Sequence, residues 1–513
     1  MKKYFLAYFF ILSLLVFTGC GNNTDNNING EKIFRYGTTA YGIEMGNTGL
    51  NPHSNYSGWS TVRYGVGETL FKFNDKMELV PWLASGYERI DDYTVKIFLK
   101  DNIKFSSGRK LDGQAVKECL EHLIHVHDRA ANDLKIDSIV ADGQTVTIKS
   151  TEKIPVLLNY LSDPYGAIID MQYGITEDDN VAGTGPFIAT EVSNTEIELR
   201  KNPDYWNGTV GMDKVFVKEI VDGDTLTMAM QSGELDAVQG LPYINLALFK
   251  NNDKYKISSA DTSRCFFMQF NYETPVLQDY NVRKAIALGI DKASFSNNLL
   301  YGNGSVATGA FPDNFSFGNQ NIIAPQFDIE EAKKLLAQSG WTDTNNDGYV
   351  DKDGQKLVIR WLTYPGRQEL PLLAEAAQAT LKQIGIDVII NNTTNQQDFF
   401  NRGDWDIYAS AFVTAPTGDP EYFFTTHCLK NSTKNRGHYY NADLEMIARQ
   451  LHDEFDPQKR AELAIKMQQI IVDDCAFVFV SHLKMSFVMK KNVVGFEADH
   501  SDYYELTADL NYN

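Results

Sequence analysis

The chain has 513 residues, enough for roughly two to four domains with sizeable apolar cores. Its 47 Lys and Arg against 67 Asp and Glu give a formal net charge of −20. A surface of this sign repels polyanions, which argues against a nucleic-acid-binding protein and against attachment to anionic lipid through the folded body.

The N-terminal residues have the pattern of an export signal. Two lysines precede the uncharged apolar run Tyr4–Phe17, which is too short for an ordinary membrane span. The run leads into Thr18-Gly-Cys20 and an Asn-rich polar stretch, which resembles a bacterial lipoprotein signal. We therefore predict a signal peptide over residues 1–19, lipidation at Cys20 and a flexible tether over 20–33. The alternative is a plain signal peptide with an incidental cysteine.

The rest of the chain carries no second membrane signal and no cysteine motif. No later segment of about 20 residues is continuously apolar. The remaining cysteines are scattered and form no C-x-x-C pair, so neither a zinc site nor a disulfide scaffold is indicated: Cys119, Cys265, Cys428 and Cys475.

The first half beyond Phe34 alternates strand and helix patterns. Tyr93–Leu99 alternates polar and apolar residues like a half-buried strand, and Leu111–Val126 has an apolar helix face. Val140–Lys149 reads as a hairpin turning at Asp142-Gly143. Asp222 fits the N-cap of a helix that Gly233 ends, before a short strand Leu235–Val238.

The second half continues the alternation and contains the clearest α/β unit. Lys356–Asn391 reads as strand, helix and strand, which implies a parallel or mixed sheet covered by helices. The other expected elements are helices over Asp279–Leu300, from Asp328 to before Gly340 and over Gln458–Asp473, and strands over Asp406–Phe412 and Ala476–Val480.

Local motifs of known enzymes are missing from the sequence. There is no Walker loop, no H-E-x-x-H zinc helix and no G-x-S-x-G nucleophile elbow. Gly183-Thr-Gly-Pro186 lacks the rest of a dinucleotide fingerprint and reads as a structural turn.

Two further patterns suggest metals without completing a site. His122, His125 and His127 could offer imidazoles, but no Cys or carboxylate stands at ligand spacing, which favours a solvated helix end. Asp343–Asp351 follows the first half of a calcium loop, but Gly354 stands where the bidentate Glu belongs, which favours an Asx-rich turn.

Charged residues after predicted elements are the candidates for ligand contact. Arg129 follows the first-half helix, Arg367 follows a strand, and Asp419 lies in the loop Thr414–Pro420 after another strand. Ligands of open α/β sheets bind at the carboxyl ends of strands, and Arg suits a carboxylate while Asp suits an amine. The alternative is that these charges are surface or structural ion-pair partners.

Ten short segments, taken in order, resemble the extracellular solute-binding proteins of peptide and nickel ABC importers, family 5. The resemblance runs from about Tyr36 to the C-terminus, and its segments are Gly49–Pro52, Glu68–Leu70, Leu79–Ala84, Lys104–Gly108, Gly183–Phe187, Lys201–Trp206, Gly233–Asp236, Asp279–Ala285, Glu331–Leu336 and Gly385–Val388.

This resemblance implies an α/β, two-lobed periplasmic-binding-protein-like fold of type II. The first lobe would cover 34–269 with an extra subdomain at about 68–190, the second 270–486, and 487–513 would return to the first. The protein would be a lipid-anchored monomer on the outer face of the cytoplasmic membrane. It would enclose a ligand between the lobes and deliver it to an ABC permease and its ATPase subunits. It would need no cofactor and no metal held by the protein, and it would catalyse nothing.

The resemblance leaves the ligand open between a nickel chelate or metallophore and a short peptide. Peptide receptors often carry an Asp for the peptide amine where this chain has Pro416 or Thr417. Nickel receptors hold chelator carboxylates with arginines, and Arg129 matches one of them, whereas Tyr165 stands near the place of a second. These matches slightly favour a metal chelate or small carboxylate-bearing ligand.

The predicted ligand-binding residues are the charged, hydroxyl and aromatic side chains expected at the cleft. They are Tyr56, Trp59, Arg129, Tyr364, Arg367, Thr414, Thr417, Asp419, Arg436, Tyr439 and Tyr503. Aromatic side chains can cover a ligand without demanding one chemistry, although Trp59 and Tyr503 could equally be core residues. The rival function is an exported hydrolase, such as a peptidase, on the same scaffold.

Overall fold

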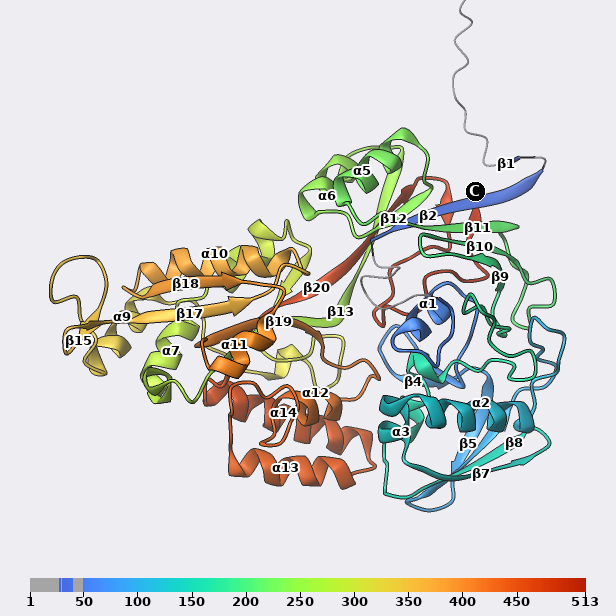
Figure 1. Ribbon diagram of the computed structural model, residues 1–513, viewed down its shortest axis with the longest axis horizontal. Coiled ribbons are helices and arrows are strands. Elements are labelled where there is room, and N and C mark those ends of the chain that lie inside the picture. The colour runs from blue at the N-terminus through green and yellow to red at the C-terminus, as the bar shows by residue number, and fades with distance from the viewer. Residues whose placement is uncertain (1–26, 29, 40–48) are drawn as a thin grey trace, which may run out of the picture.

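The computed structural model describes residues 27–28, 30–39 and 49–513, which form two lobes side by side (Figure 1). The predicted signal peptide over 1–19 and Cys20 lie outside the described residues. No helix of the described ranges is long and apolar enough to cross a membrane.

The first lobe, at the right of Figure 1, combines the N-terminal half of the chain with its C-terminal end. Its strands and helices outside the subdomain are β1 (Asn27–Ile28), β2 (Glu31–Thr38), α1 (Ser57–Arg63), β3 (Phe71–Phe73), β4 (Leu79–Pro81), α4 (Leu157–Tyr160), η2 (Pro164–Gly166), β9 (Phe187–Val192), β10 (Glu196–Lys201), β11 (Lys214–Glu219), α5 (Gly223–Ser232), β12 (Ala237–Gln239), α6 (Tyr243–Lys250), β21 (Val493–Val494) and β22 (Asn511–Tyr512).

A separate sheet covered by helices forms the lower part of the first lobe. Its strands are β5 (Ala84–Arg89), β6 (Thr94–Leu99), β7 (Ile136–Asp142) and β8 (Thr145–Ser150), and its helices are α2 (Gly113–Val126) and α3 (Asp128–Leu134). The Asp112 carboxylate caps α2 by accepting from Ala115 N at 2.9 Å. The predicted helix, strand and Asp142-Gly143 turn are therefore confirmed.

The second lobe, at the left of Figure 1, is built from the later part of the chain. Its elements are η3 (Pro275–Gln278), α7 (Tyr280–Leu288), α8 (Lys292–Ser294), η4 (Phe295–Leu299), β14 (Gly304–Val306), η5 (Asn319–Asn321), α9 (Ile329–Gln338), β15 (Asp351–Lys352), β16 (Gln355–Lys356), β17 (Val358–Thr363), α10 (Glu369–Lys382), β18 (Asp387–Asn392), α11 (Gln396–Arg402), β19 (Ile407–Val413), α12 (Glu421–His427), α13 (Ala442–Asp453) and α14 (Pro457–Asp473).

The predicted α/β unit is confirmed as β17, α10 and β18. The two strands pair in parallel, from Val358 opposite Asp387 to Thr363 opposite Asn392, and β19 joins β17 in the same direction. The parallel arrangement places the loops that follow β17 and β19 at one edge of the sheet. Arg367 and the loop Thr414–Pro420 lie in these two loops.

Two long strands carry the chain between the lobes, β13 (Tyr255–Phe270) and β20 (Phe477–Lys490). They pair antiparallel over most of their length, with an irregularity between Asp261 and Cys265. The mixed sheet consequently runs through both lobes in the order β18-β17-β19-β13-β20-β12-β2-β11-β10-β9. The strand predicted at Ala476–Val480 is thus only the first part of β20.

The helix predicted over Asp279–Leu300 is wrong as one element. Helix α7 ends at Leu288, and the chain restarts with Asp291 as a new cap, its carboxylate accepting from Ser294 N at 2.8 Å. A Cβ on Gly289 would lie 2.7 Å from Leu381 Cδ2, so α10 packs directly on this break. Apolar periodicity continued across the break because both pieces bury one face.

One hydrophobic cluster joins the lobes. It combines Val62, Phe73 and Tyr503 of the first lobe with Ala415 and Phe423 of the second. The lobes are therefore in direct apolar contact in this structure.

Candidate functional site

The lobe junction is the surface where α1 and residues 502–505 of the first lobe meet residues 414–420 of the second. Trp59 packs edge-to-face on Tyr503, with ring centroids 5.4 Å apart. The Tyr503 hydroxyl donates to Pro416 O at 2.7 Å. Tyr503 is therefore a direct contact between lobes, whereas Tyr56 beside α1 is 56% exposed.

The loop after β19 is held from both lobes. The Thr414 hydroxyl donates to Ala310 O at 2.7 Å in its own lobe, while Asn159 of the first lobe donates to Thr417 O at 2.9 Å. Gly418 has a φ of +67°, and a Cβ there would lie 2.7 Å from Phe73 Cε1. The loop therefore approaches the first lobe through its backbone. The Thr417 hydroxyl is buried without a hydrogen-bond partner.

The Asp419 carboxylate is bound within the second lobe. Arg460 donates to both of its oxygens, at 2.7 and 2.9 Å, and also pairs with Glu421 at 2.9 Å. His452 lies 2.7 Å from Glu421 through Nδ1 and extends the network. The carboxylate that the sequence offered for a ligand amine thus fixes the loop instead.

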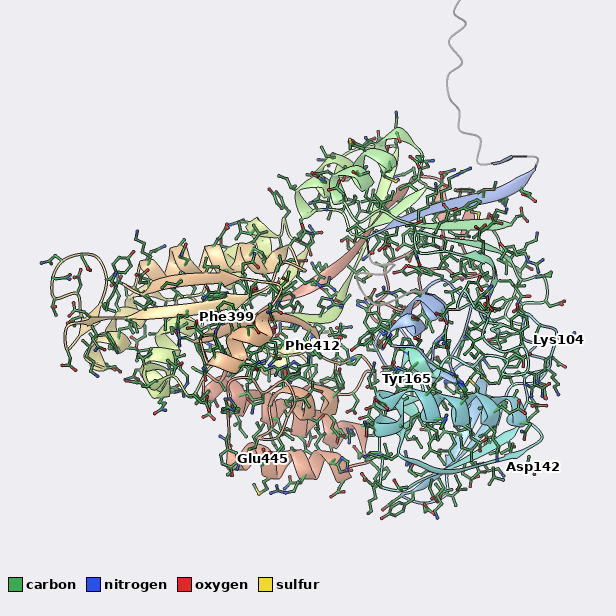
Figure 2. All side chains as sticks on the ribbon, viewed as in Figure 1. Lys104, Asp142, Tyr165, Phe399, Phe412 and Glu445 are labelled. Carbon is green, nitrogen blue, oxygen red and sulfur yellow. The ribbon has the colours of Figure 1, made fainter. Side chains whose placement is uncertain are left out.

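Arg129 likewise lies against acids of its own lobe. It pairs with the buried Asp163 and, at 3.5 Å, with Asp133, and its guanidinium lies 4.9 Å from the Tyr165 ring. Burial raises the pKa of Asp133 to about 6, against the effect of Arg129. Figure 2 shows Tyr165 on the side of the first lobe that faces Phe412 of the second lobe. Arg129 and Tyr165 therefore lie together in an ion-pair cluster within the first lobe.

The remaining second-lobe candidates divide by their contacts. The Tyr364 hydroxyl lies 3.2 Å from Ala411 N and 3.4 Å from Ala411 O, and the Tyr439 hydroxyl donates to Asp474 at 2.6 Å. Arg436 stacks on Phe400, 4.8 Å from the ring centroid. Within the described ranges, no hydrogen bond or ion pair engages the Arg367 guanidinium.

The sequence reasoning missed a second charged group at the lobe junction. Arg63 pairs with Asp502 and, at 3.6 Å, with Glu505, which also accepts from Tyr36 at 2.9 Å. Arg264 of β13 lies close enough to this group that Asp502 favours its charged form and Arg63 disfavours it. The sequence did contain one sign of this group. Arg264 is a lone charged residue directly before the apolar strand residues Cys265-Phe-Phe, where a charge is unexpected.

The histidines near the end of α2 differ: His125 is exposed, as expected of a solvated helix end, whereas His122 and His127 make internal contacts. His127 is buried, with Nε2 3.0 Å from Asn55 O and Nδ1 accepting from Ala130 N. His122 Nδ1 lies 2.7 Å from His53 Nδ1. These contacts attach the segment before α1 to α2 and α3. In the part of the chain that is described, no three His, Cys, Asp or Glu side chains are arranged to hold a metal ion.

The other sequence motifs are structural. In the Asp343–Asp351 loop the Asp343 carboxylate accepts from the backbone N–H groups of Asp347 and Gly348, which confirms an Asx-rich turn. The four cysteines after Cys20 are free and buried, and burial raises the pKa of the Cys119 thiol to about 12. A thiol in this state is a poor nucleophile.

The continuous sheet and the contact of two lobes through loops at its edge define the class of two-lobed, type II solute-binding proteins. Residues 78–435 match the model of bacterial extracellular solute-binding proteins, family 5 Middle. The chain belongs to this family, whose members are extracytoplasmic substrate-binding proteins of ABC importers rather than enzymes.

Individual relatives include nickel and peptide receptors. The nickel-binding protein NikA of Staphylococcus aureus is 30% identical over 405 residues, which cover 79% of this chain and 80% of that protein. The oligopeptide-binding protein AppA of Bacillus subtilis is 26% identical over 459 residues, or 83% and 82% of the two chains. The structure of S. aureus NikA with Ni(L-His)2 matches with a TM-score of 0.76 at 26% identity, covering 94% of this chain and 100% of that one.

Removing the Arg129 charge tests whether this residue stabilises the folded protein. We expect Arg129→Gln to lower the free energy of unfolding by about 3 kcal/mol, because the buried Asp163 loses its cation. The measurement is urea unfolding, and Asp163→Asn in the same background should recover part of the loss. Unchanged stability of Arg129→Gln would contradict the structural role.

Glu505 predicts a pH dependence of stability. Burial raises its pKa to about 7, against the opposing effects of Arg63 and the Tyr36 hydrogen bond. The folded state therefore holds a proton that the unfolded chain releases near pH 4.5, so stability is lost as pH rises from about 4.5 to about 7. We expect Glu505→Gln to flatten urea-measured stability across this window by about 1–3 kcal/mol relative to wild type. Parallel pH profiles of the two proteins would rule this out.

Proposed function

We propose that this protein captures a small carboxylate-bearing ligand, a metal chelate or a short peptide, between its two lobes. It then presents the closed complex to an ABC permease powered by ATPase subunits. The observation that carries the proposal is the convergence of aromatic and cationic side chains from both lobes. Trp59, Tyr503 and Arg63 come from the first lobe. Arg367 and Tyr364 follow β17 in the second lobe, where Arg367 lies close enough to Asp502, and Tyr364 to Arg264, for their charges to interact.

The same surface supports an organic anion better than a bare cation. Guanidinium groups pair with carboxylates through two parallel hydrogen bonds, and aromatic rings cover apolar parts of a ligand. A nickel ion would accordingly arrive as cargo bound to an acid such as histidine, as in the structure of the S. aureus relative.

The contacts of the 414–420 loop favour a chelate over a long peptide. Pro416 and Thr417 stand where a peptide receptor often offers an Asp, and Asp419 is already bound by Arg460. The similarity to AppA supports the alternative of a short peptide. Arg367 is the cation that either ligand could use for its carboxylate.

We also propose that the mature protein begins at a lipidated Cys20 and acts as a monomer at the outer face of the cytoplasmic membrane. The apolar run, the Gly-Cys pair and the polar segment behind it support this arrangement. The lobes of 34–269 and 270–486 would then stand clear of the lipid on a short tether.

Ligand capture is tested by calorimetry on the mature protein with nickel chloride, L-histidine, their mixture and a set of tripeptides. We expect one ligand per chain, with nickel plus histidine binding and nickel alone not binding. Binding should raise the free energy of unfolding by about 2.7 kcal/mol at a ligand concentration of 100 times Kd. If nickel chloride alone bound as tightly as the mixture of nickel and L-histidine, the proposal that the ligand is a metal chelate would be rejected.

The same incubations separate a receptor from a hydrolase. Mass spectrometry of the tripeptides after several hours should show intact ligand. Cleavage products that accumulate with time would overturn the receptor function.

Lipidation is tested by labelling cells with radioactive palmitate. We expect label on the wild-type protein and none on Cys20→Ser, which should be released from the membrane fraction. Cys119→Ser is the control and should stay labelled. A labelled Cys20→Ser protein would refute the anchor.

A further inference from the structure

A cavity of about 150 Å³ lies within the first lobe. Its wall includes residues of the loop before β3, residues of β3 itself, Trp82 directly after β4, and residues 504–509 of the returning chain. Every residue that lines it belongs to the first lobe, so it is not the space between the lobes. A cavity of this volume can hold a benzene-sized group.

The cavity contains a cation that has no bonded acid. The Lys72 ammonium lies 3.4 Å from the ring centroid of Trp82 and 5.9 Å from that of Tyr504. The indole therefore covers one side of the cation. No hydrogen bond or ion pair reaches this ammonium from any residue that the structure describes. Its three N–H groups are consequently available to a ligand in the cavity.

The acid in the wall of this cavity is already fully bonded. Four side chains donate to the two carboxylate oxygens of Glu68 at 2.8 or 2.9 Å, and they are Trp82, Thr184, Tyr205 and Trp206. A carboxylate has about four acceptor positions, so Glu68 has none left for Lys72. This saturation explains why the ammonium is unpaired although a buried acid lies in the same wall.

The charges and the apolar wall together define the class of ligand. The apolar part of the wall comes from Val62, Pro186, Leu506 and Ala508. One free ammonium suits one carboxylate, whereas the charge of the buried Glu68 disfavours a ligand with two negative charges, such as a phosphate. A carboxylate of about benzoate size would place its ring in the cavity and its oxygens on Lys72.

The segments that line the cavity also touch the second lobe. Lys72 lines the cavity, while the next residue, Phe73, lies so close to the loop 414–420 that a Cβ on the glycine there would be 2.7 Å from its ring. Tyr504 lines the cavity, while Tyr503 donates to a carbonyl of the same loop at 2.7 Å. The Tyr504 hydroxyl accepts from Phe73 N at 3.2 Å, which joins the two segments.

We propose that this cavity is a second binding site, for a small apolar carboxylate held by Lys72, and that its occupation favours contact between the lobes. The site goes beyond the proposed function, because it is separate from the ligand between the lobes. A ligand that fixes Lys72 and Tyr504 also fixes the neighbouring Phe73 and Tyr503 where they touch the second lobe. The coupling is reciprocal, so a ligand between the lobes would tighten this site as well.

Binding is tested by calorimetry on the mature protein with sodium benzoate, benzamide and inorganic phosphate. We expect one benzoate per chain, and far weaker binding of benzamide, which lacks the charge, and of phosphate, which lacks the ring. Lys72→Met should raise the Kd for benzoate about 10-fold or more. The matched control Lys76→Met, exposed in the turn after β3, should bind as wild type. Equal Kd values for wild type and Lys72→Met, or no benzoate binding by wild type, would overturn the site.

Two further variants separate the cavity from the fold and from the lobe junction. Ala508→Leu fills the cavity and leaves Lys72 in place, so it should weaken benzoate binding even if Lys72→Met lowers the Tm of the ligand-free protein. Arg367→Gln lies in the second lobe and should leave the Kd for benzoate unchanged. Benzoate binding that is lost in Arg367→Gln and kept in Ala508→Leu would place benzoate between the lobes and reject the cavity.

Coupling to the lobes is tested by titrating nickel with L-histidine, with and without saturating benzoate. We expect benzoate to lower the Kd about 5-fold in the wild type and to leave it unchanged in Lys72→Met. An unchanged or raised Kd in the wild type would overturn the coupling. A wild-type protein that binds neither nickel with histidine nor tripeptides contradicts the proposed function, whereas the benzoate titrations still decide whether the cavity is a site.

Discussion

The antiparallel ladder between β13 and β20 is the constraint on which the rest of the structure depends. Its backbone hydrogen bonds run from the pairing of Tyr255 with Lys490 to that of Gln269 with Phe477, and they make one sheet of both lobes. Rotation of one lobe against the other must bend this ladder. The interruption between Asp261 and Cys265 is where the backbone is freest to absorb that bend, since hinges are a few residues at element ends or irregularities.

The distribution of charge separates the surface from the junction. The chain carries a formal net charge of −20, yet arginines gather where the lobes meet. Salt at physiological concentration screens exposed charges over about 8–10 Å. The acidic exterior therefore has little effect on an anion that is bound between the lobes. At the junction, where Arg63 is buried and Arg264 and Arg367 are partly buried, guanidinium groups act more strongly than exposed charges do. The net charge is therefore a guide to solubility and to surface partners, whereas the side chains at the lobe junction determine which ligand is bound.

Local chemistry explains which features the sequence could predict. Asp112, Asp222 and Asp328 each cap a helix, because the carboxylate accepts from the backbone N–H three residues later. The β17-α10-β18 unit is also formed by segments close together in the chain. The pair of Arg63 and Asp502 joins residues separated by 439 positions, and no local pattern marks such a contact. Asp419 was proposed for a ligand because no local pattern reveals its partner Arg460, which lies 41 residues away on α14. The fold was thus readable from short-range signals and from family resemblance, whereas the ion-pair partners required the tertiary structure.

Closure and ligand selection rest on different groups. The contacts across the junction from Tyr503 and Asn159 end on the backbone carbonyls of Pro416 and Thr417, in a loop made rigid by the buried Asp419–Arg460 pair. These contacts form whatever the ligand is. At the same junction, Asp502 favours the charge on Arg264 more than Arg63 opposes it. A ligand must therefore favour the touching lobes through contacts that it makes with both lobes at once, because only differential affinity for the two arrangements shifts a conformational equilibrium.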